Sequence, residues 1–302
     1  MATASTSLER YAWLSVAAAL ATIGLKTLAW WLTDSVALLS DALESLVNLA
    51  AALLALSMLR LAARAPNQDH PFGFSKAEYF SAGIEGALIV LAAAGILAAA
   101  LPRLVAPQPI GMAGWGLALT ALATVINLAV GLALIRAGRR HRSITLEADG
   151  RHLMTDVWTS GGVLLGVALA LTTGWLVLDP LVALAVAAHI IWTGIRLMRR
   201  SVTGLLDGAI PQTDRAEIDK LFAEYSRRYG ISFHALLTRR AAARRFITFH
   251  MLVPDQWSVA QAHRLSEEIE ERVRELVDGA HVTTHIEPIS DPASYDDQKL
   301  DR

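Results

Sequence analysis

Six long apolar stretches constrain this chain more than any other feature. A helix needs about 20 mostly apolar residues to cross about 30 Å of hydrocarbon. It also satisfies its own backbone hydrogen bonds where no water is present. The sequence therefore predicts six membrane-spanning helices rather than six buried helices of a soluble protein. The stretches cover residues 11–33, 37–62, 79–101, 112–136, 144–172 and 177–199.

Charged residues are concentrated in the last third of the 302-residue chain. The last 95 residues hold 29 charged side chains, whereas the first 207 hold 26. This distribution predicts a membrane domain over residues 1–207 and a soluble domain over 208–290. The polar residues 291–302 are expected to form a disordered tail. The net charge of −1 argues against a nucleic-acid partner, and the chain has no cysteine for disulfides or thiolate ligands.

Lys and Arg residues flank the links after spans two and four and follow span six. The links after spans one, three and five carry Arg103 as their one cation. Because cytoplasmic loops are enriched in positive residues, both termini are expected in the cytoplasm, with the spans in an inner or plasma membrane. The cations that set this orientation are Arg60, Arg64, Lys76, Arg136, Arg139, Arg140, Arg142, Arg151, Arg196, Arg199 and Arg200.

The soluble segment alternates between helix and strand patterns. Thr213 is expected to cap its first helix, and Ser258 and Gln261 match a capping box for the second. The order α-β-β-α-β predicts a small ferredoxin-like α+β domain with its helices on one face of the sheet. The helices are expected over 214–229 and 258–277, and the strands over 231–239, 246–253 and 281–288, with 241–245 as a hairpin link.

Two of the predicted spans carry polar residues at helical spacing. Glu44 and Asn48 are four residues apart in span two, and His152 and Asp156 have the same spacing in span five. Each pair therefore shares one helical face. Facing helices would gather two carboxylates, an imidazole and an amide, a ligand set that suits zinc or another divalent transition metal. The alternative is a hydrogen-bonded cluster that only holds the helices together.

Other polar residues in the spans have less defined roles. Asp41 lies one turn before Glu44 and is open to three interpretations: ligand, proton carrier or helix cap. Lys26 and Glu85 are expected to pair with each other or with the backbone. Asn127 is expected to serve packing or hydrogen bonding.

Five of the nine histidines lie in the soluble segment. His285 and Glu287 are two residues apart on a predicted strand, so they share one face of the sheet. His234 and His250 lie on the other two predicted strands, and His263 lies on the second helix. The spacing alone indicates a candidate metal site.

Several motifs together resemble a known family. Span two contains the segment from Ser40 to Asn48, and span five contains His152-Leu-Met-Thr-Asp156. The loop after span two reads Asp69-His70-Pro71-Phe72-Gly73-Phe74-Ser75-Lys76-Ala77-Glu78. Over residues 10–290 the chain resembles the cation diffusion facilitators, proton-coupled exporters of zinc and related divalent metals. The resemblance implies a homodimer that lowers cytoplasmic metal by alternating access in exchange for protons.

The resemblance also implies site residues. The transport ligands fall on Glu44, Asn48, His152 and Asp156. Zinc exporters of the family usually have Asp or His at the position of Glu44 and Asp at that of Asn48. The choice among zinc, cadmium, iron, cobalt and manganese therefore stays open.

Three further features are implied by the resemblance alone. A loop metal site is weakened because Phe74 replaces its second His, which leaves Asp69 and His70. Lys76 and Asp207 match a salt bridge near the dimer contact. A cytoplasmic binuclear zinc site is implied on His234, His250, His263, His285 and Glu287.

Two functions other than proton-coupled export are alternatives for this sequence. One is a membrane metalloenzyme, although the sequence has no His-Glu-x-x-His motif and no phosphate-binding glycine loop. The other is a membrane-anchored metal sensor that transports nothing. Metal flux driven by a proton gradient in liposomes separates both from a transporter.

Overall fold

The computed structural model describes residues 2–33, 36–106, 114–175 and 177–298, with only the backbone given for some stretches, among them 36–44 and 163–172. These residues form eight α-helices, one three-stranded sheet and a short 3-10 helix. The chain divides into two compact units, Met1–Val202 and Thr203–Arg302.

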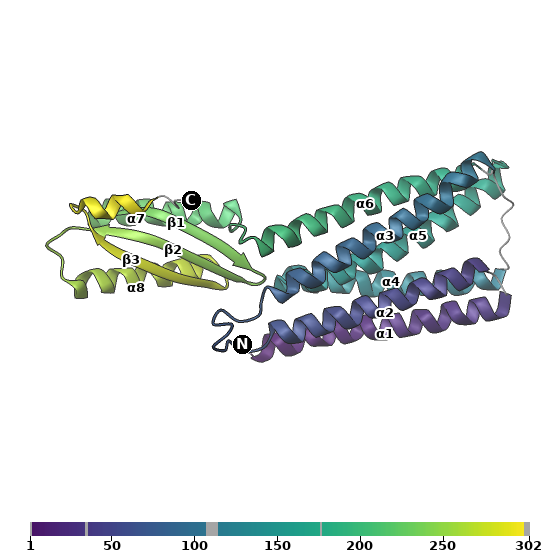
Figure 1. Cartoon of the computed structure of the whole chain (residues 1–302), viewed down its shortest axis with the longest axis horizontal. Coiled ribbons are helices and arrows are strands. Elements are labelled where there is room, and N and C mark those ends of the chain that lie inside the picture. Colours follow the sequence, from purple (N-terminus) through teal and green to yellow (C-terminus); the bar gives the residue numbers. More distant parts are fainter. Residues whose placement is uncertain (1, 34–35, 107–113, 176, 299–302) are drawn as a thin grey trace. The chain divides into compact units, whose positions relative to one another are not determined.

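Six helices form the first unit (Figure 1). Among the described residues, four segments are long and apolar enough to cross a membrane: Leu8–Ala29, Ala77–Val105, Ala118–His141 and Pro180–Leu205. The prediction of a helical membrane domain is therefore confirmed. The helices are α1 (Ala2–Thr33), α2 (Val36–Ala62), α3 (Ala77–Val105), α4 (Gly114–His141), α5 (Ile144–Thr173) and α6 (Leu178–Leu205).

Glycines allow two pairs of these helices to approach closely. A Cβ atom on Gly194 of α6 would lie 3.0 Å from the carbonyl oxygen of Gly86 on α3. A Cβ atom on Gly150 of α5 would lie 2.8 Å from the carbonyl oxygen of Gly131 on α4. Small residues at helix contacts are typical of membrane bundles, where dispersion and close backbone packing replace the hydrophobic effect.

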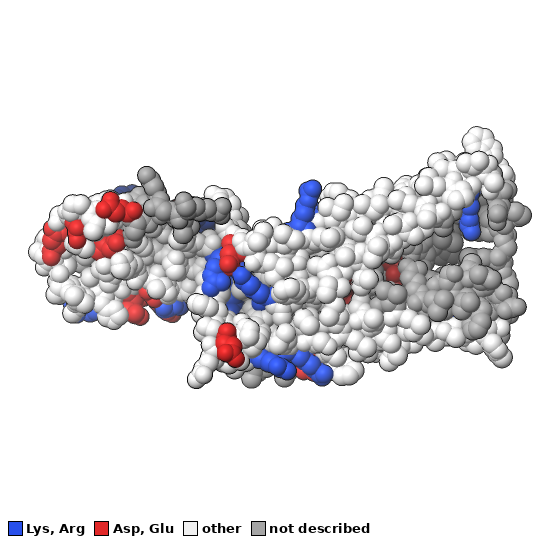
Figure 2. Space-filling model, viewed as in Figure 1, with Lys and Arg blue, Asp and Glu red and all other residues white. Residues whose placement is uncertain are grey.

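The sides of the helical unit are largely uncharged (Figure 2), and most of its Lys and Arg side chains lie towards one end. Large apolar side chains such as Leu20, Leu91 and Trp192 are more than half exposed there. A soluble protein rarely exposes so much contiguous apolar surface. This surface suits contact with lipid.

The second unit is the α+β domain predicted from the sequence. Its sheet has the order β1-β2-β3, with β1 and β2 antiparallel and β2 and β3 parallel. The parallel pair requires a crossover, which α8 supplies. The elements are α7 (Gln212–Tyr229), β1 (Ser232–Ala241), β2 (Arg244–Val253), α8 (Val259–Leu276), β3 (Ala280–Pro288) and the 3-10 helix η1 (Pro292–Gln298).

Both helices of this unit cover the same face of the sheet. Phe222 of α7 stacks on Phe233 of β1 and contacts Phe249 of β2, and Ile269 of α8 belongs to the same buried cluster. Because side chains alternate along a strand, His250 points away from the helices, whereas its neighbour Phe249 points towards them. The opposite face of the sheet therefore holds the histidines.

Local details of this unit differ from the sequence expectations in three places. Pro211, not Thr213, is the N-cap of α7, with φ −54° and ψ 144°, and Thr213 lies inside the helix. The β1–β2 link is shorter than predicted, because the strands extend to Ala241 and Arg244. The tail forms η1, in which the Tyr295 hydroxyl donates to the carbonyl of Ile289 at 3.0 Å. The capping box at Ser258, in contrast, is confirmed.

Candidate functional site

The membrane unit brings together three of the four predicted transport ligands. The side chains of Asn48 on α2 and of His152 and Asp156 on α5 are all buried. Nε2 of His152 donates to Oδ1 of Asn48 at 2.7 Å, and Nδ2 of Asn48 donates to Oδ2 of Asp156. The asparagine amide thus bridges an imidazole and a carboxylate. A nitrogen and two oxygen ligands converge on one small volume inside the bundle.

A fourth polar side chain reaches this cluster from α4. Nδ2 of Asn127 donates to Oδ2 of Asp156 at 3.1 Å, and Asn127 is also buried. Within the described part of the chain, Oδ1 of Asn127 and Nδ1 of His152 find no hydrogen-bond partner. Sequence spacing could not assign Asn127 to the site, because a lone polar residue does not reveal which face of its helix meets a neighbour. The unpaired oxygen gives the cluster one more potential metal-facing group.

The structure does not place the side chains of the other two candidates in α2. Asp41 and Glu44 lie in the helix, but their side chains are outside the described residues. Glu44 precedes Asn48 by four residues in the sequence, a spacing that predicts a shared helical face. Its role as a ligand stays a prediction.

The loop candidates Asp69 and His70 lie between α2 and α3 on an exposed turn. The backbone N–H of His70 donates to Oδ1 of Asn67 at 2.7 Å, and its ring lies 4.4 Å from the ring of Phe74. An aromatic neighbour takes the place where the resemblance expects a second histidine. The weakness of this site is retained as a prediction.

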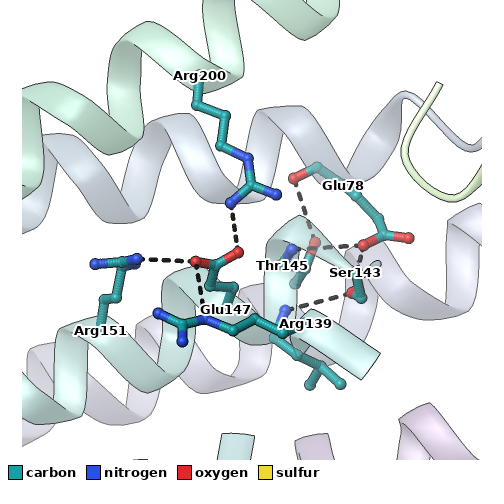
Figure 3. A network of polar contacts seen from close by, with 8 residues as sticks. Glu78, Arg139, Ser143, Thr145, Glu147, Arg151 and Arg200 are labelled. Carbon is teal, nitrogen blue, oxygen red and sulfur yellow. Dashed lines mark hydrogen bonds and ion pairs between the residues drawn. The ribbon is translucent and has the colours of Figure 1, made fainter. Parts of the chain in front are cut away.

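A second polar network lies near the start of α5 (Figure 3). The carboxylate of Glu147 binds three arginines: Arg151 at 2.9 Å, Arg139 at 3.9 Å, and Arg200. It therefore ties the end of α4 and the end of α6 to α5. Glu147 is not among the residues singled out from the sequence. Its i,i+4 spacing to Arg151 is a signal that could have revealed this pair, whereas the partners Arg139 and Arg200 depend on the fold.

Glu78 makes a separate set of bonds in the same region (Figure 3). Its carboxylate accepts from the Ser143 hydroxyl and from the backbone N–H of Thr145 at 3.4 Å, and its carbonyl accepts from the Thr145 hydroxyl at 3.2 Å. These bonds join the first turn of α3 to the first turn of α5. The two carboxylates at the centres of these networks precede the transport-site cluster: Glu147 lies five residues before His152 on α5, and Glu78 lies in the first turn of α3.

The cytoplasmic unit gathers four predicted ligands on the open face of its sheet. Oε2 of Glu287 lies 2.8 Å from Nε2 of His234 and 3.2 Å from Nδ1 of His250. Its other oxygen, Oε1, lies 3.5 Å from Nε2 of His285. The strand register explains this convergence, because His250 pairs with His234 on β1 and with His285 on β3. The β-bulge that follows His234 adds local twist at this point.

The chemistry of this cluster fits a metal. Each histidine directs a ring nitrogen at one carboxylate, and the two carboxylate oxygens serve different histidines. Nδ1 of His234 has no hydrogen-bond partner among the residues described. Imidazole nitrogens and carboxylate oxygens are the usual non-thiolate ligands of zinc. Such an ion could be held by the four side chains of this cluster, in which the Glu287 carboxylate faces the imidazoles of His234, His250 and His285.

Three predicted residues are not brought to these clusters within one chain. His263 is exposed on α8, on the helical layer, and so lies away from the histidine face of the sheet. Lys76 is the N-cap residue of α3. Oδ1 of Asp207 lies 3.3 Å from Nη1 of Arg239 in its own unit. The ligand role of His263 and the Lys76–Asp207 salt bridge stay predictions.

Comparisons with known proteins define the class. Residues 12–206 match the model of the cation efflux transmembrane domain, and residues 210–289 match the model of the cation efflux protein cytoplasmic domain. An uncharacterised transporter of Synechocystis is 50% identical over 285 residues, which cover 94% of this chain and 92% of that protein. The cation-efflux pump FieF of Salmonella arizonae is 30% identical over 283 residues, which cover 93% of each chain. Such a chain is an integral membrane transporter for cations, not an enzyme.

The chain belongs to the cation diffusion facilitator family of metal transporters. Among solved structures, it is similar to the metal-bound C-terminal domain of the CzcD transporter from Thermotoga maritima. That match has 27% identity, covers 28% of this chain and 99% of that chain, and has a TM-score of 0.25.

Proposed function

We propose that this protein exports a divalent transition metal, with zinc favoured, from the cytoplasm in exchange for protons. It works as a homodimer, and alternating access moves the metal site between the two membrane faces. Both termini and the α+β domain lie in the cytoplasm, at the inner or plasma membrane. Cadmium, iron, cobalt and manganese are the competing substrates.

The observation that carries this proposal is the convergence of Asn48, His152 and Asp156 inside the helical unit. Buried polar groups in a membrane domain are costly unless they serve a partner or a pathway. Here Asn48 hydrogen-bonds to both His152 and Asp156. The cluster also offers an imidazole nitrogen, an amide oxygen and a carboxylate oxygen, which are atom types that bind metals. A divalent cation can replace these bonds with coordination. The Asp156 carboxylate, with Glu44 as the expected second one, would offset its 2+ charge in a low-dielectric site.

Proton exchange follows from the same ligands. A metal binds neutral imidazole and ionised carboxylate, so protons compete with it for the site. In this arrangement Nε2 of His152 carries a proton that it donates to Asn48. Binding at that nitrogen requires the proton to leave it. Protons that return from the opposite face would then favour metal release without ATP.

The cytoplasmic cluster supports a second role for metal. His234, His250, His285 and Glu287 would bind zinc as a resident ion that reports cytoplasmic metal and strengthens the dimer. The match of residues 210–289 to the family's cytoplasmic domain supports this role.

The test is metal flux in proteoliposomes with an imposed proton gradient. Asp156→Ala should abolish zinc flux while the protein remains folded and dimeric by size-exclusion chromatography. Asp219→Ala removes an exposed carboxylate on α7, at 54% side-chain exposure, and should transport normally. Near-normal flux from folded Asp156→Ala protein would refute the transport site.

A further inference from the structure

A groove with a volume of about 180 Å³ lies between α4, α5 and α6 on the outside of the helical unit. Its apolar wall includes Ile135 of α4, Trp158 of α5 and Ile190 of α6. Trp158 is 50% exposed, so this wall is open to the surroundings of the bundle. Because α4 and α6 contain segments that are long and apolar enough to cross a membrane, the groove borders the lipid of a bilayer.

Polar side chains line the same groove at successive levels. Arg151 of α5 precedes Trp158 by seven residues, about 10 Å along the helix axis. His189 of α6 lies at the level of Trp158, with its ring centre 5.5 Å from that of the indole. Since the end of α6 lies at the beginning of α5, Thr193 lies one turn nearer than His189 to the level of Arg151. The groove therefore runs from a guanidinium, past a hydroxyl, to an imidazole beside an apolar wall.

His189 occupies an unusual place for an ionisable residue. It is exposed on α6 within the candidate span Pro180–Leu205, whereas histidines in membrane spans normally face the interior of the bundle. Its ring contacts the rings of Trp158 and Trp192. Within the described part of the chain, it forms no hydrogen bond. An imidazole at this position needs a polar partner from outside the chain, and hydrocarbon cannot provide one.

The charge at the Arg151 end of the groove is positive. Figure 3 shows the guanidinium groups of Arg139, Arg151 and Arg200 around the carboxylate of Glu147. Three positive charges share one negative charge, so this network has a net charge of +2. Each guanidinium has five N–H donors, more than one carboxylate can engage. The network can therefore accept a second anion.

The nature of the lining selects the occupant. The described residues that line the groove include no carboxylate, and the positive charge of Arg151 repels a metal ion. Clusters of basic residues at the ends of membrane helices attract anionic lipid headgroups. Arg is suited to phosphate because its planar guanidinium can form two parallel hydrogen bonds with it.

We propose that this groove binds one anionic phospholipid, with the phosphate on Arg151 and one acyl chain along Trp158 and Ile190. The Arg151 side chain reaches Glu147, one turn nearer the start of α5, which places the phosphate at the outer end of the groove. Thr193 and His189 then donate to the glycerol and ester oxygens of the same molecule. Lipid binding here requires no metal in the transport site, so the lipid site and the transport function can fail separately.

The test is a lipid titration of the purified full-length protein in detergent, followed by its melting temperature. Phosphatidylglycerol, which is anionic, should raise the melting temperature at concentrations at which phosphatidylcholine has no effect. Arg151→Gln should weaken the binding of phosphatidylglycerol by about tenfold or more, because it removes the charged donor. Arg140→Gln is the control: it removes an exposed arginine at the end of α4 that does not line the groove. It should bind phosphatidylglycerol nearly as tightly as the wild type.

Three outcomes would overturn the proposal. The first is equal affinity of Arg151→Gln and Arg140→Gln for phosphatidylglycerol. The second is an equal rise in melting temperature with inorganic phosphate, which would show a site for soluble anions. The third is a changed oligomeric state of Arg151→Gln by size-exclusion chromatography, which would identify the groove as a contact between two copies of the chain.

If Arg151→Gln does not fold, bromine-labelled lipids decide. Vesicles of phosphatidylglycerol and phosphatidylcholine are prepared with bromine on the acyl chains of one lipid or the other, at equal mole fraction. Bromine quenches the fluorescence of an indole that it contacts. The share of the quenching that is lost in Trp158→Phe should be larger when phosphatidylglycerol carries the bromine. Equal shares for the two lipids would refute an anionic lipid beside Trp158.

Discussion

At the scale of single residues, Asn48 links the two halves of the membrane cluster. Its amide accepts from His152 through Oδ1 and donates to Asp156 through Nδ2. A carboxylate could accept in both places but could not donate. The amide therefore holds the metal-free site together without adding a charge to it.

Replacing Asn48 by Asp should change selectivity and pH dependence more than stability. The new carboxylate would face Asp156 where an N–H donor now lies, so the metal-free site should hold an additional proton near neutral pH. Zinc flux should then depend more steeply on pH, and the ratio of zinc flux to cadmium flux should rise. Flux of both metals from pH 6 to 8 measures this. An identical zinc-to-cadmium ratio and pH profile would show that Asn48 does not face the metal.

Asn127→Leu should weaken zinc binding by about 10–100-fold, the usual effect of removing a residue that orients a metal ligand. The substitution keeps the volume but removes the 3.1 Å bond to the Asp156 carboxylate. Thr159→Val is the control, because the Thr159 hydroxyl bonds the backbone carbonyl of Asp156 rather than its carboxylate. Zinc titrations of the purified proteins measure the difference. Equal affinity of both variants would remove Asn127 from the site.

At the scale of elements, the helices could be predicted because apolar length and caps are local properties of a sequence. The capping box at Ser258 depends on four consecutive residues and was predicted correctly. The cap at Thr213 was wrong because Pro211, which precedes it, has the extended ψ of an N-cap and starts the helix earlier. Spacing placed His152 and Asp156 on one face of α5, but the approach of Asn127 to Asp156 depends on how the helices pack.

Gly194→Ala should separate α3 from α6, because its Cβ would lie 3.0 Å from the carbonyl oxygen of Gly86. Overpacking of this kind destabilises by about 1–3 kcal/mol, and the variant should unfold at a lower temperature and transport more slowly. Gly95→Ala on α3 is the control, since nothing lies within 4 Å of its new Cβ. It should be as stable as wild type or slightly more so. Equal melting temperatures for both variants would contradict the close contact.

At the scale of the whole molecule, the two proposed metal sites belong to separate units, so we expect them to bind zinc independently. His250→Ala combined with His285→Ala should lower the zinc content of the full-length protein and leave the membrane site able to bind. Asp156→Ala should have the complementary effect. Elemental analysis of the histidine double variant, of Asp156→Ala and of their combination checks this. The zinc lost in the combination should equal the sum of the two separate losses. Unchanged zinc content in the histidine variant would remove the cytoplasmic site.

Because β3 follows α8 in the chain and pairs with β2, the cytoplasmic cluster is completed late in the synthesis of each chain. During synthesis, β1 and β2 emerge first and can pair through their short link, which brings His234 beside His250. The carboxylate that all three histidines approach is on β3, which emerges only after α8. A ribosome that stops before Ala280 leaves two histidines without Glu287. Zinc should therefore bind at the sheet in chains whose translation has passed β3, and bind less well in chains that stop before it.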